Sequence, residues 1–330
     1  MIITRAPLRI PLGGGGTDLP GYCSNYGGFI LSAAINKYVY INVNKPSIQD
    51  VLRVKYSKTE EVFDVAELKH DLVRESLKLL NVNDKLEISA MADVPSGTEM
   101  GSSGSFTVSL LMALHSYKRV HASLKDLAEE ACKIEMDILK HPSGKHDQYL
   151  AAFGGITCLE IAKDQSVKVT PIYLSHHDMD ELRNNILLFY TGIRRNSCDV
   201  LREQSDGAKQ SQIVCETYHE IKEIGMMIKN TLEKGNLDDF GKLLHKHWLV
   251  KKRTSNKVSN SNIDNLYDVG IKEGALGGKL MGAGGGGFLM FYCSSDGGRK
   301  SRLRKAMTAA GLKELLFDFD TDGTKVLMNF

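Results

Sequence analysis

The pattern of hydrophobic and polar residues divides the first half of the chain into β-rich runs and longer segments with a helical period. Continuous or alternating apolar runs predict strands, and these lie at residues 29–43, 51–56, 86–91 and 156–161. Apolar residues three or four positions apart predict amphipathic helices, and these lie at residues 65–80, 102–117 and 124–139. Residues 141–155 break the period and predict a loop that leads into a short helical segment.

The second half of the chain also contains both strand-like and helix-like segments, with most of the helices in its centre. It predicts strands at residues 186–190, 279–281, 288–292, 314–318 and 325–328. It predicts helices at residues 199–233, 237–254, 262–273 and 298–310. The polar stretch 175–185 separates the halves, so we divide the chain into an N-terminal domain, residues 1–180, and a C-terminal domain, residues 181–330. Strands and helices mixed in this way predict an α+β fold of two domains.

Composition and charge argue against several classes of protein. The 330 residues are 42% hydrophobic and carry 42 Lys and Arg against 40 Asp and Glu, a net charge of +2. This composition lacks the basic tract that binds nucleic acid or an anionic membrane surface. No apolar run is long enough to span a bilayer, and the first residues lack the apolar core of a signal peptide. The scattered cysteines form no Cys-x-x-Cys pair, so we expect neither zinc nor disulfides and place the protein in the cytoplasm.

The segment PSGTEMGSSGSF, residues 95–106, joins a predicted strand to the long predicted helix. Glycines let the backbone approach an anion closely, and the first turn of a helix offers unpaired N–H groups at the positive end of its dipole. The same residues also suit a serine-capped helix after a mobile turn, and composition alone leaves these two interpretations even. A Walker loop is excluded, because no lysine lies in this turn.

A second glycine-rich segment, GKLMGAGGGGF at residues 278–288, joins two short predicted strands. Its glycines lose much backbone entropy on folding, which favours close approach to a ligand over a purely structural loop. A third glycine run lies at residues 13–16. It does not open a dinucleotide-binding unit, because Pro20 predicts a turn where that unit needs a helix.

Together with APLRIPLGGGGTD near the start, these segments resemble, in order, the three motifs of the GHMP kinases, named after galactokinase, homoserine kinase, mevalonate kinase and phosphomevalonate kinase. The resemblance covers essentially the whole chain. It implies a ribosomal-S5-like N-terminal domain, a ferredoxin-like C-terminal domain, and a cleft between them that binds ATP and Mg²⁺. The form GGGGTDLP is most similar to D-glycero-D-manno-heptose 7-phosphate kinases. That likeness implies phosphorylation of the anomeric hydroxyl to heptose 1,7-bisphosphate for surface-polysaccharide synthesis.

By this resemblance the ATP phosphates bind to the first glycine-rich segment, at Pro95, Gly97, Gly101, Ser102, Ser103, Gly104 and Ser105. Ser103 matches a magnesium-binding serine, and Glu135 stands where the family has its magnesium-binding glutamate. Without the family, Glu135 is interpreted as a carboxylate on a solvated helix face. Glu99 departs from the family, whose members have a small residue there. Its carboxylate repels triphosphate unless it faces solvent or a cation.

Phosphoryl transfer also needs a group that orients or deprotonates the acceptor hydroxyl. Asp147 in GKHDQ matches the family's aspartate at the acceptor, and Arg9 matches the basic residue that keeps this aspartate ionised. An ordinary aspartate is a weak base at neutral pH, so orientation and proton abstraction both stay open. The substrate is assigned to the glycine motifs, at Gly15, Gly16, Thr17, Asp18, Gly284 and Gly285. We expect the glycines at positions 15 and 16 to leave room for the longer arm of a heptose.

A phosphorylated sugar also needs cations away from its reacting end. Arg194 and Arg195 follow a predicted strand, and we expect them to clamp the phosphate because a guanidinium group presents a planar pair of donors. Lys145 and His146 are second candidates. The basic run at residues 251–253 is interpreted as a solvated helix end.

Two other functions stay open on the sequence. The first is a kinase of the same fold whose acceptor is a neutral sugar such as galactose or fucose, which needs no phosphate clamp. The second is a non-catalytic relative that binds ATP and sugar and signals to a partner protein. Glu99 favours that relative, while the presence of Asp147, Glu135 and Ser103 argues against it. The sequence carries no signature of oligomeric state.

Overall fold

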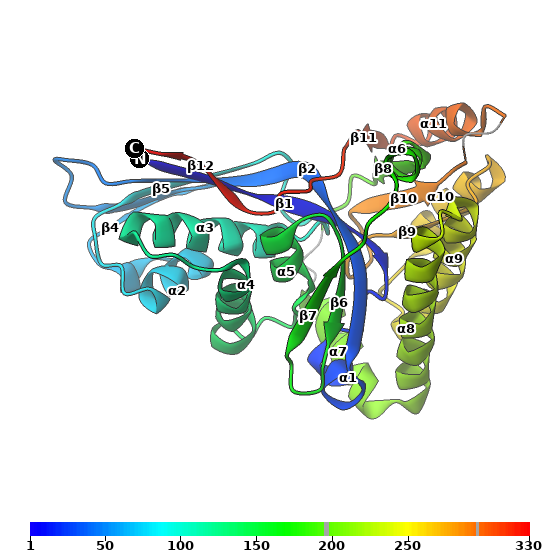
Figure 1. The fold of residues 1–330 in the computed structure, drawn as a ribbon, viewed down its shortest axis with the longest axis horizontal. Coiled ribbons are helices and arrows are strands. Elements are labelled where there is room, and N and C mark those ends of the chain that lie inside the picture. Colours follow the sequence, from blue (N-terminus) through cyan, green and yellow to red (C-terminus); the bar gives the residue numbers. More distant parts are fainter. Residues whose placement is uncertain (195–197, 295–296) are drawn as a thin grey trace.

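A long sheet forms the N-terminal half of the computed structural model, which describes residues 1–194, 198–294 and 297–330 (Figure 1). Its strand order is β12-β1-β2-β5-β3-β4, and β6 and β7 extend it from β2. The strands are β1 (Ile2–Gly13), β2 (Gly28–Asn44), β3 (Leu52–Lys55), β4 (Thr59–Val62), β5 (Glu87–Ala92), β6 (Ile156–Ile161), β7 (Val167–Pro171) and β12 (Lys325–Asn329). Their pairings are antiparallel, except that β3 runs parallel to β5.

Strand β2 holds the two arms of this sheet together. One of its edges pairs with β1 along most of its length. Its other edge pairs with β6 at residues 28–33 and with β5 at residues 39–44. The sequence of β2 is rich in Ile, Val, Tyr and Phe, which suit a pleated and largely buried surface, and the strand is mostly buried.

Helices cover one face of the large sheet, with α3 against its centre (Figure 1). They are α2 (Asp71–Leu79), α3 (Ser102–Lys118), α4 (Leu124–Cys132) and α5 (His146–Phe153). Helix α3 packs on β1 and β2 and also contacts α2, α4 and α5. Because neighbours surround it, α3 is buried at almost every position from 104 to 115. Its first turn and that of α5 therefore lie close to the end of β1.

The C-terminal half contains a smaller antiparallel sheet of β8 (Ile186–Tyr190), β9 (Gly277–Leu280), β10 (Phe288–Tyr292) and β11 (Lys313–Leu315). Its strand order is β11-β8-β10-β9. Helices separate β8 from β9 and β10 from β11, so the chain follows the βαββαβ path of a ferredoxin-like domain. The α+β fold with a ferredoxin-like second half is therefore confirmed.

The helices of the C-terminal half are α6 (His176–Asn185), α7 (Cys198–Gln210), α8 (Gln212–Glu233), α9 (Leu237–Lys251), α10 (Ser261–Lys272) and α11 (Arg299–Ala309). Helices α8 and α9 lie side by side; α8 also packs on β1 and β2, while α9 packs on β9 (Figure 1). This pair of helices thus joins the two sheets. No helix in the described ranges combines the length and the apolar character needed to cross a bilayer.

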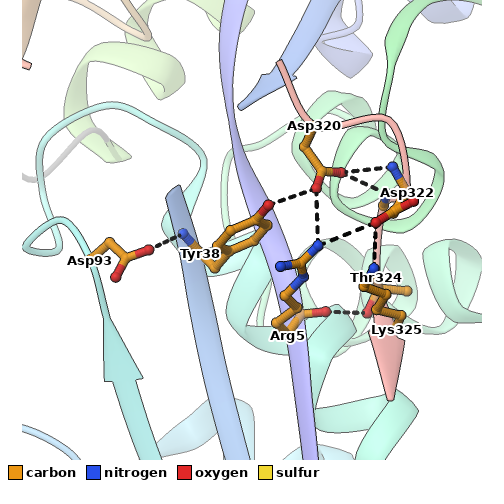
Figure 2. A network of polar contacts seen from close by, with 8 residues as sticks. Arg5, Tyr38, Asp93, Asp320, Asp322, Thr324 and Lys325 are labelled. Carbon is orange, nitrogen blue, oxygen red and sulfur yellow. Dashed lines mark hydrogen bonds and ion pairs between the residues drawn. The ribbon is translucent and has the colours of Figure 1, made fainter. Parts of the chain in front are cut away.

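The last residues of the chain return to the large sheet, where β12 pairs with β1 as an edge strand beside the N-terminus (Figure 1). The Asp320 carboxylate, which is almost fully buried, accepts hydrogen bonds from the Tyr38 hydroxyl (2.8 Å) and the backbone N–H of Gly323 (2.8 Å) (Figure 2). The Arg5 guanidinium reaches both Asp320 (3.5 Å) and Asp322 (3.3 Å). This network fastens β12 to β1, so the predicted C-terminal domain contributes a strand to the N-terminal sheet. The division at residue 180 stays a prediction.

Several elements differ from the expectations for physical reasons. Helix α1 (Pro20–Tyr26) begins at Pro20, where we predicted a turn, because proline fits the first position of a helix. The helix expected over 124–139 changes at Lys133–Ile138 into a wider π-helix. The helix expected over 199–233 is broken at Ser211, whose backbone is extended. The polar stretch 175–185 is mostly α6, and β1, β4 and β7 were not predicted.

We predict that Asp320→Ala lowers the free energy of unfolding by roughly 2 kcal/mol or more, because it leaves buried donors without their acceptor. Urea denaturation monitored by circular dichroism measures this change. Asp322→Ala is the matched control: it removes an exposed partner of the same Arg5 and should lower stability by less than about 1 kcal/mol. Equal effects of the two variants would contradict the structural role of the buried carboxylate.

Candidate active site

A cavity of about 360 Å³ opens between the end of β1, the first turns of α3 and α5, and residues of α7 and α9. Among the predicted site residues, its lining includes Arg9, Gly15, Gly16, Asp18, Gly97, Gly101, Ser102, Ser103 and Asp147. Segments that are far apart in the sequence thus meet at one place. Pro95, Thr17, Gly104, Ser105, Glu135, Arg194, Gly284 and Gly285 lie outside this lining.

The first turn of α3 faces this cavity through Ser102 and Ser103. Gly101 precedes the helix in the left-handed region, with φ +77°, and a Cβ there would lie 3.1 Å from Asp147 Cγ. A Cβ at Gly104 would lie 2.9 Å from the backbone of Asp147 and Gln148. These glycines therefore let α3 approach α5 closely, while the N–H groups of the first turn are available to an anion.

Ser105, Pro95 and Ser103 of the same segment differ in how exposed they are. Ser105 is buried and its hydroxyl donates to the carbonyls of Pro7 (2.7 Å) and Gly101 (3.1 Å), so it fastens α3 to β1. Pro95 is exposed at the start of the loop. Ser103 is exposed to the cleft, which suits it for contact with a ligand or metal ion. The roles of all three in binding ATP stay predictions.

Arg9 and Asp147 form an ion pair at the base of the cavity. The Arg9 Nε donates to Asp147 Oδ1 at 2.8 Å, and its Nη1 donates to the carbonyl of Glu99 at 2.6 Å. Arg9 is buried, whereas the Asp147 side chain keeps 27% of its surface exposed. Burial raises the pKa of Asp147, but the charge and hydrogen bond of Arg9, together with His146, outweigh burial, so the pKa lies below its ordinary value. Asp147 is thus an ionised acceptor that faces the cavity.

Asp18 lies beside this pair and is held by the loop before α5. The backbone N–H of His146 donates to Asp18 Oδ2 at 3.2 Å. Burial raises the pKa of Asp18 to about 6, and repulsion from the Asp147 carboxylate adds to the rise. A Cβ at Gly144 would lie only 2.1 Å from Asp18 Oδ2, so this position has to be glycine. The carboxylate is placed to accept hydrogen bonds from a ligand with hydroxyl groups.

The glycines at positions 15 and 16 differ in the space around them. A Cβ at Gly15 would meet nothing within 4 Å, whereas one at Gly16 would lie 2.9 Å from Cε1 of the buried Tyr218. Thr17 is buried, and its hydroxyl donates to the carbonyls of Gly14 (2.9 Å) and Phe29 (2.8 Å). Thr17 therefore shapes the turn, and its expected contact with the sugar stays a prediction.

Glu135 lies in the π-helix behind the phosphate loop and is buried. Gln148 Nε2 donates to its Oε1 at 3.0 Å. Burial raises the pKa of Glu135 to about 7, although hydrogen bonds with Gln148 and Ser103 oppose the rise. Gln148 Oε1 and Ser143 Oγ are buried oxygens without a hydrogen-bond partner in the described part of the chain. Oxygen atoms of this kind are the ligands that Mg²⁺ prefers, so the residues fit such an ion.

Glu99 is buried and turns toward the second glycine-rich loop rather than outward to solvent. Its backbone adopts φ +65°, which explains why a glycine suits this position. Its Oε2 accepts a hydrogen bond from the backbone N–H of Ala283 at 2.6 Å. A Cβ at Gly282 would lie 2.1 Å from the same oxygen. Glu99 thus bridges the two glycine-rich loops at the cavity wall.

The remaining glycines of the second loop pack against protein backbone. Gly284 has φ +121°, and a Cβ there would lie 2.6 Å from the carbonyl of Val258. The N–H of Gly285 donates to that carbonyl at 2.9 Å. Gly282 and Ala283, which directly precede these glycines, line the cavity instead. A contact of Gly284 or Gly285 with substrate stays a prediction.

The structure does not place the expected phosphate clamp in the cavity lining it describes. Arg194 is exposed and is not part of the cavity lining. Arg195 lies outside the residues that the structure describes. Lys145 donates to both carboxylate oxygens of Glu129, at 2.8 and 2.7 Å, so its charge is already paired. Burial lowers the pKa of His146 to about 3, so this cavity residue is a neutral imidazole.

The interpretation of residues 251–253 as a solvated helix end is wrong for Lys251. Arg253 is exposed and pairs with Glu220. Lys252 pairs with Asp264 at 3.1 Å. Lys251, however, is only 5% exposed and lines the cavity. It lies in phase with the apolar residues that α9 buries, which is the signal in the sequence that could have shown its position.

Comparison with known proteins gives this site its context. The family description "GHMP kinases N terminal domain" matches residues 65–155, and "GHMP kinases C terminal" matches residues 227–312. Together the two matches cover more than half of the chain. The chain belongs to the GHMP kinase family. The resemblance seen in the three motifs is thereby confirmed, and the chain is a kinase whose family transfers a phosphoryl group from ATP.

Relatives within the GHMP kinases include several that act on sugars. The D-glycero-alpha-D-manno-heptose 7-phosphate kinase of Campylobacter jejuni is 29% identical over 98% of each chain. The L-fucokinase/L-fucose-1-P guanylyltransferase of Bacteroides fragilis is 26% identical over 92% of this chain, which spans 36% of that protein. The crystal structure of a D-glycero-D-manno-heptose 1-phosphate kinase from Bacteroides thetaiotaomicron has a TM-score of 0.83 and 25% identity over the full length of both chains.

We predict that Arg9→Met moves the acidic limb of the pH–rate profile to higher pH. The Arg9 charge lowers the pKa of Asp147 against the effect of burial, so its loss raises that pKa and protonates the carboxylate at a higher pH. The profile of kcat/KM is measured down to about pH 4, the ordinary pKa of an aspartate, so that it includes the titration of Asp147. Arg9→Lys keeps the charge and should restore much of the profile. An unmoved limb in Arg9→Met would show that Arg9 does not control this carboxylate.

We predict that Glu99→Gln lowers the KM for ATP by about threefold at low salt. The amide keeps the shape of the side chain but removes one negative charge from the cavity wall, an effect of somewhat under 1 kcal/mol at solvent-like dielectric. Steady-state kinetics at two salt concentrations measures it, and the difference should shrink at high salt. A KM that stays constant or rises would contradict an electrostatic effect of Glu99 on the nucleotide.

Proposed function

We propose that this kinase transfers the γ-phosphoryl group of ATP to the anomeric hydroxyl of D-glycero-D-manno-heptose 7-phosphate, giving heptose 1,7-bisphosphate. The observation that carries the proposal is the ion pair of Arg9 and Asp147 at the base of a cavity that the phosphate loop also lines. The heptose 7-phosphate kinase that matches 98% of the chain supports the choice of acceptor. A role in surface-polysaccharide synthesis and a cytoplasmic location follow from this assignment.

The chemistry needs little covalent work from the protein. The first turn of α3, which includes Ser102, holds the triphosphate. The unpaired N–H groups of this turn stabilise negative charge. Asp147 accepts a hydrogen bond from the acceptor hydroxyl and orients it. It takes the hydroxyl proton as the oxygen bonds to the γ-phosphorus and the bond from that phosphorus to the ADP oxygen breaks, so that ADP leaves. Because the pKa of Asp147 is low, orientation and charge stabilisation contribute more than strong basicity. Arg9 offsets negative charge that develops near the transferred group.

Magnesium completes the proposed site. Ser103 and Glu135 would hold it in this assignment, and Gln148, which donates to Glu135, has a further buried oxygen atom. The ion, when bound, neutralises charge on the phosphates of ATP. The neutral His146 and the carboxylate of Asp18 are left to position the sugar. Gly15 borders open space, which this assignment gives to the longer arm of a seven-carbon sugar, whereas Gly16 lets the turn approach Tyr218.

The substrate's own phosphate is the part of the assignment that separates it from a neutral-sugar kinase. Arg194 and Arg195 stay the proposed clamp for this phosphate. The fucokinase relative, which matches 92% of this chain, makes a neutral sugar the second candidate acceptor. Nucleic acid is not expected as a partner, because the net charge is only +2.

We predict that the purified protein releases ADP from magnesium-ATP in the presence of D-glycero-D-manno-heptose 7-phosphate and not with mannose 6-phosphate, galactose or fucose. Asp147→Asn should reduce the turnover by about a hundredfold or more, because it removes the charged acceptor at the reacting hydroxyl. A coupled ADP assay measures both effects.

The panel also separates the alternatives. Turnover of fucose or galactose instead would keep the fold and the reaction but replace the acceptor. ATP binding without turnover of any sugar would favour a non-catalytic sensor. Activity that Asp147→Asn leaves intact would remove Asp147 from the mechanism.

A further inference from the structure

Two lysines are buried beside the active-site cavity without a carboxylate partner among the described residues. Lys251 ends α9 and lines the cavity; its Nζ donates to the carbonyl of Gly282, and no ion pair involves it in the described part of the chain. Lys279 on β9 is completely buried, and within residues 1–194, 198–294 and 297–330 its Nζ has no hydrogen-bond partner. A buried charge is normally paired, so these lysines need an explanation.

Of the two lysines, Lys251 lines the cavity and Lys279 does not. Lys251 lies at the cavity wall next to Gln204, Gly282 and Ala283. Lys279 is not part of the cavity lining, although it lies near enough to Lys251 for the charge of Lys251 to lower its pKa. Lys251 is therefore the one of the two that a ligand in the cavity can touch.

The charge state of Lys251 suits contact with an anion. Burial lowers its pKa to about 8, while the Glu99 carboxylate opposes this change and the Arg9 guanidinium adds to it. Asp18 also raises the pKa from the opposite wall. Lys251 therefore keeps its proton at neutral pH. Burial lowers the pKa of Lys279 much further, and the nearby Lys251 charge contributes to that shift.

Two other cations near the cavity, Arg9 and Lys145, are already engaged within the protein. Arg9 donates to Asp147 and to the carbonyl of Glu99, and Lys145 donates to Glu129. An ammonium group has three N–H donors, and the carbonyl of Gly282 accepts one of those of Lys251. Its charge and its remaining donors are thus available for a ligand that brings its own negative charge.

We propose that Lys251 is a phosphate-binding residue of this cleft, whose ammonium group donates hydrogen bonds to a phosphate oxygen of the bound ligand. The phosphate has two possible sources, the terminal phosphate of ATP and the phosphate carried by the sugar. The second source rests on the proposed function; the first does not. A phosphate at this position supplies the counter-charge that the buried lysine lacks, and its binding holds Lys251 in the protonated state.

The test uses Lys251→Met, which keeps a long apolar stem and removes the charge, and Lys251→Arg, which keeps the charge. Lys242→Met is the matched control, because Lys242 lies on the same helix, is exposed and pairs with Asp239. Calorimetry measures the affinities for magnesium-ATP, ADP and D-glycero-D-manno-heptose 7-phosphate. Circular dichroism and the melting temperature show whether each variant is folded.

We expect Lys251→Met to weaken one ligand by about tenfold or more, equivalent to about 1.4 kcal/mol. Contact with the terminal phosphate weakens ATP and spares ADP, whereas contact with the sugar phosphate weakens the heptose phosphate and spares both nucleotides. Lys251→Arg should recover part of the loss, and Lys242→Met should change nothing. Affinities of Lys251→Met within twofold of the unaltered protein for every ligand would overturn the proposal.

Two further controls keep the outcome decisive. If Lys251→Met does not fold, the unaltered protein is titrated from pH 7 to pH 9, a window centred on the lowered pKa of Lys251. Affinity for ATP relative to ADP, or for the sugar phosphate, must then fall as the lysine loses its proton, and a flat profile for both overturns the proposal. If the heptose phosphate does not bind to the unaltered protein, the proposed function fails, and the comparison of ATP with ADP alone decides the role of Lys251.

Discussion

The ion pair of Arg9 and Asp147 is the interaction on which the rest of the site depends. It joins the end of β1 to the first turn of α5, and Arg9 extends the contact to the phosphate loop through the carbonyl of Glu99. The close approach is possible because Gly101 and Gly104 have no side chains to separate α3 from α5. One guanidinium group thus fixes three segments and sets the charge of the carboxylate that faces the acceptor.

The cavity brings groups of opposite charge together in a small volume, and the environment of each group determines whether it is charged at neutral pH. Burial leaves His146 neutral and raises the pKa values of Asp18 and Glu135, while Arg9 keeps Asp147 ionised. Pairs of titratable groups whose pKa values are moved apart are typical of enzyme active sites. A phosphoryl-transfer site needs this arrangement, because the ligand brings several negative charges that cations, dipoles and magnesium have to balance.

Much of the fold could be predicted because local patterns determine it. The strands at residues 156–161, 186–190 and 288–292 coincide with β6, β8 and β10, and the glycine and serine residues of the phosphate loop precede α3 as expected. The N-terminal strand β1 was missed because its prolines and arginines obscure the alternation. The tertiary network of Asp320, which returns β12 to the first sheet, has no local signal at all (Figure 2).

Some residues of the candidate site could likewise be predicted from their sequence neighbours, whereas others depend on contacts between distant segments. Motif residues such as Arg9 and Asp147 are recognisable by their neighbours, and the structure brings them together. Lys251 was missed, because a lysine in a basic run is usually solvated and only the packing of α9 on β9 reveals its burial. The sequence left open whether Glu99 repels the nucleotide or turns to solvent or a cation. In the structure its carboxylate accepts a hydrogen bond from the backbone N–H of Ala283, and its charge raises the pKa of Lys251.

Phosphorus NMR of the reaction product tests the account's central claim most directly. The enzyme is incubated with magnesium-ATP and D-glycero-D-manno-heptose 7-phosphate, and the carbon that carries the new phosphate is identified through its coupling to the sugar protons. The account predicts a bisphosphate whose new phosphate couples to the anomeric proton, formed together with an equal amount of ADP. A phosphate on any other carbon, or ADP accompanied only by inorganic phosphate, would contradict transfer to the anomeric hydroxyl at Asp147.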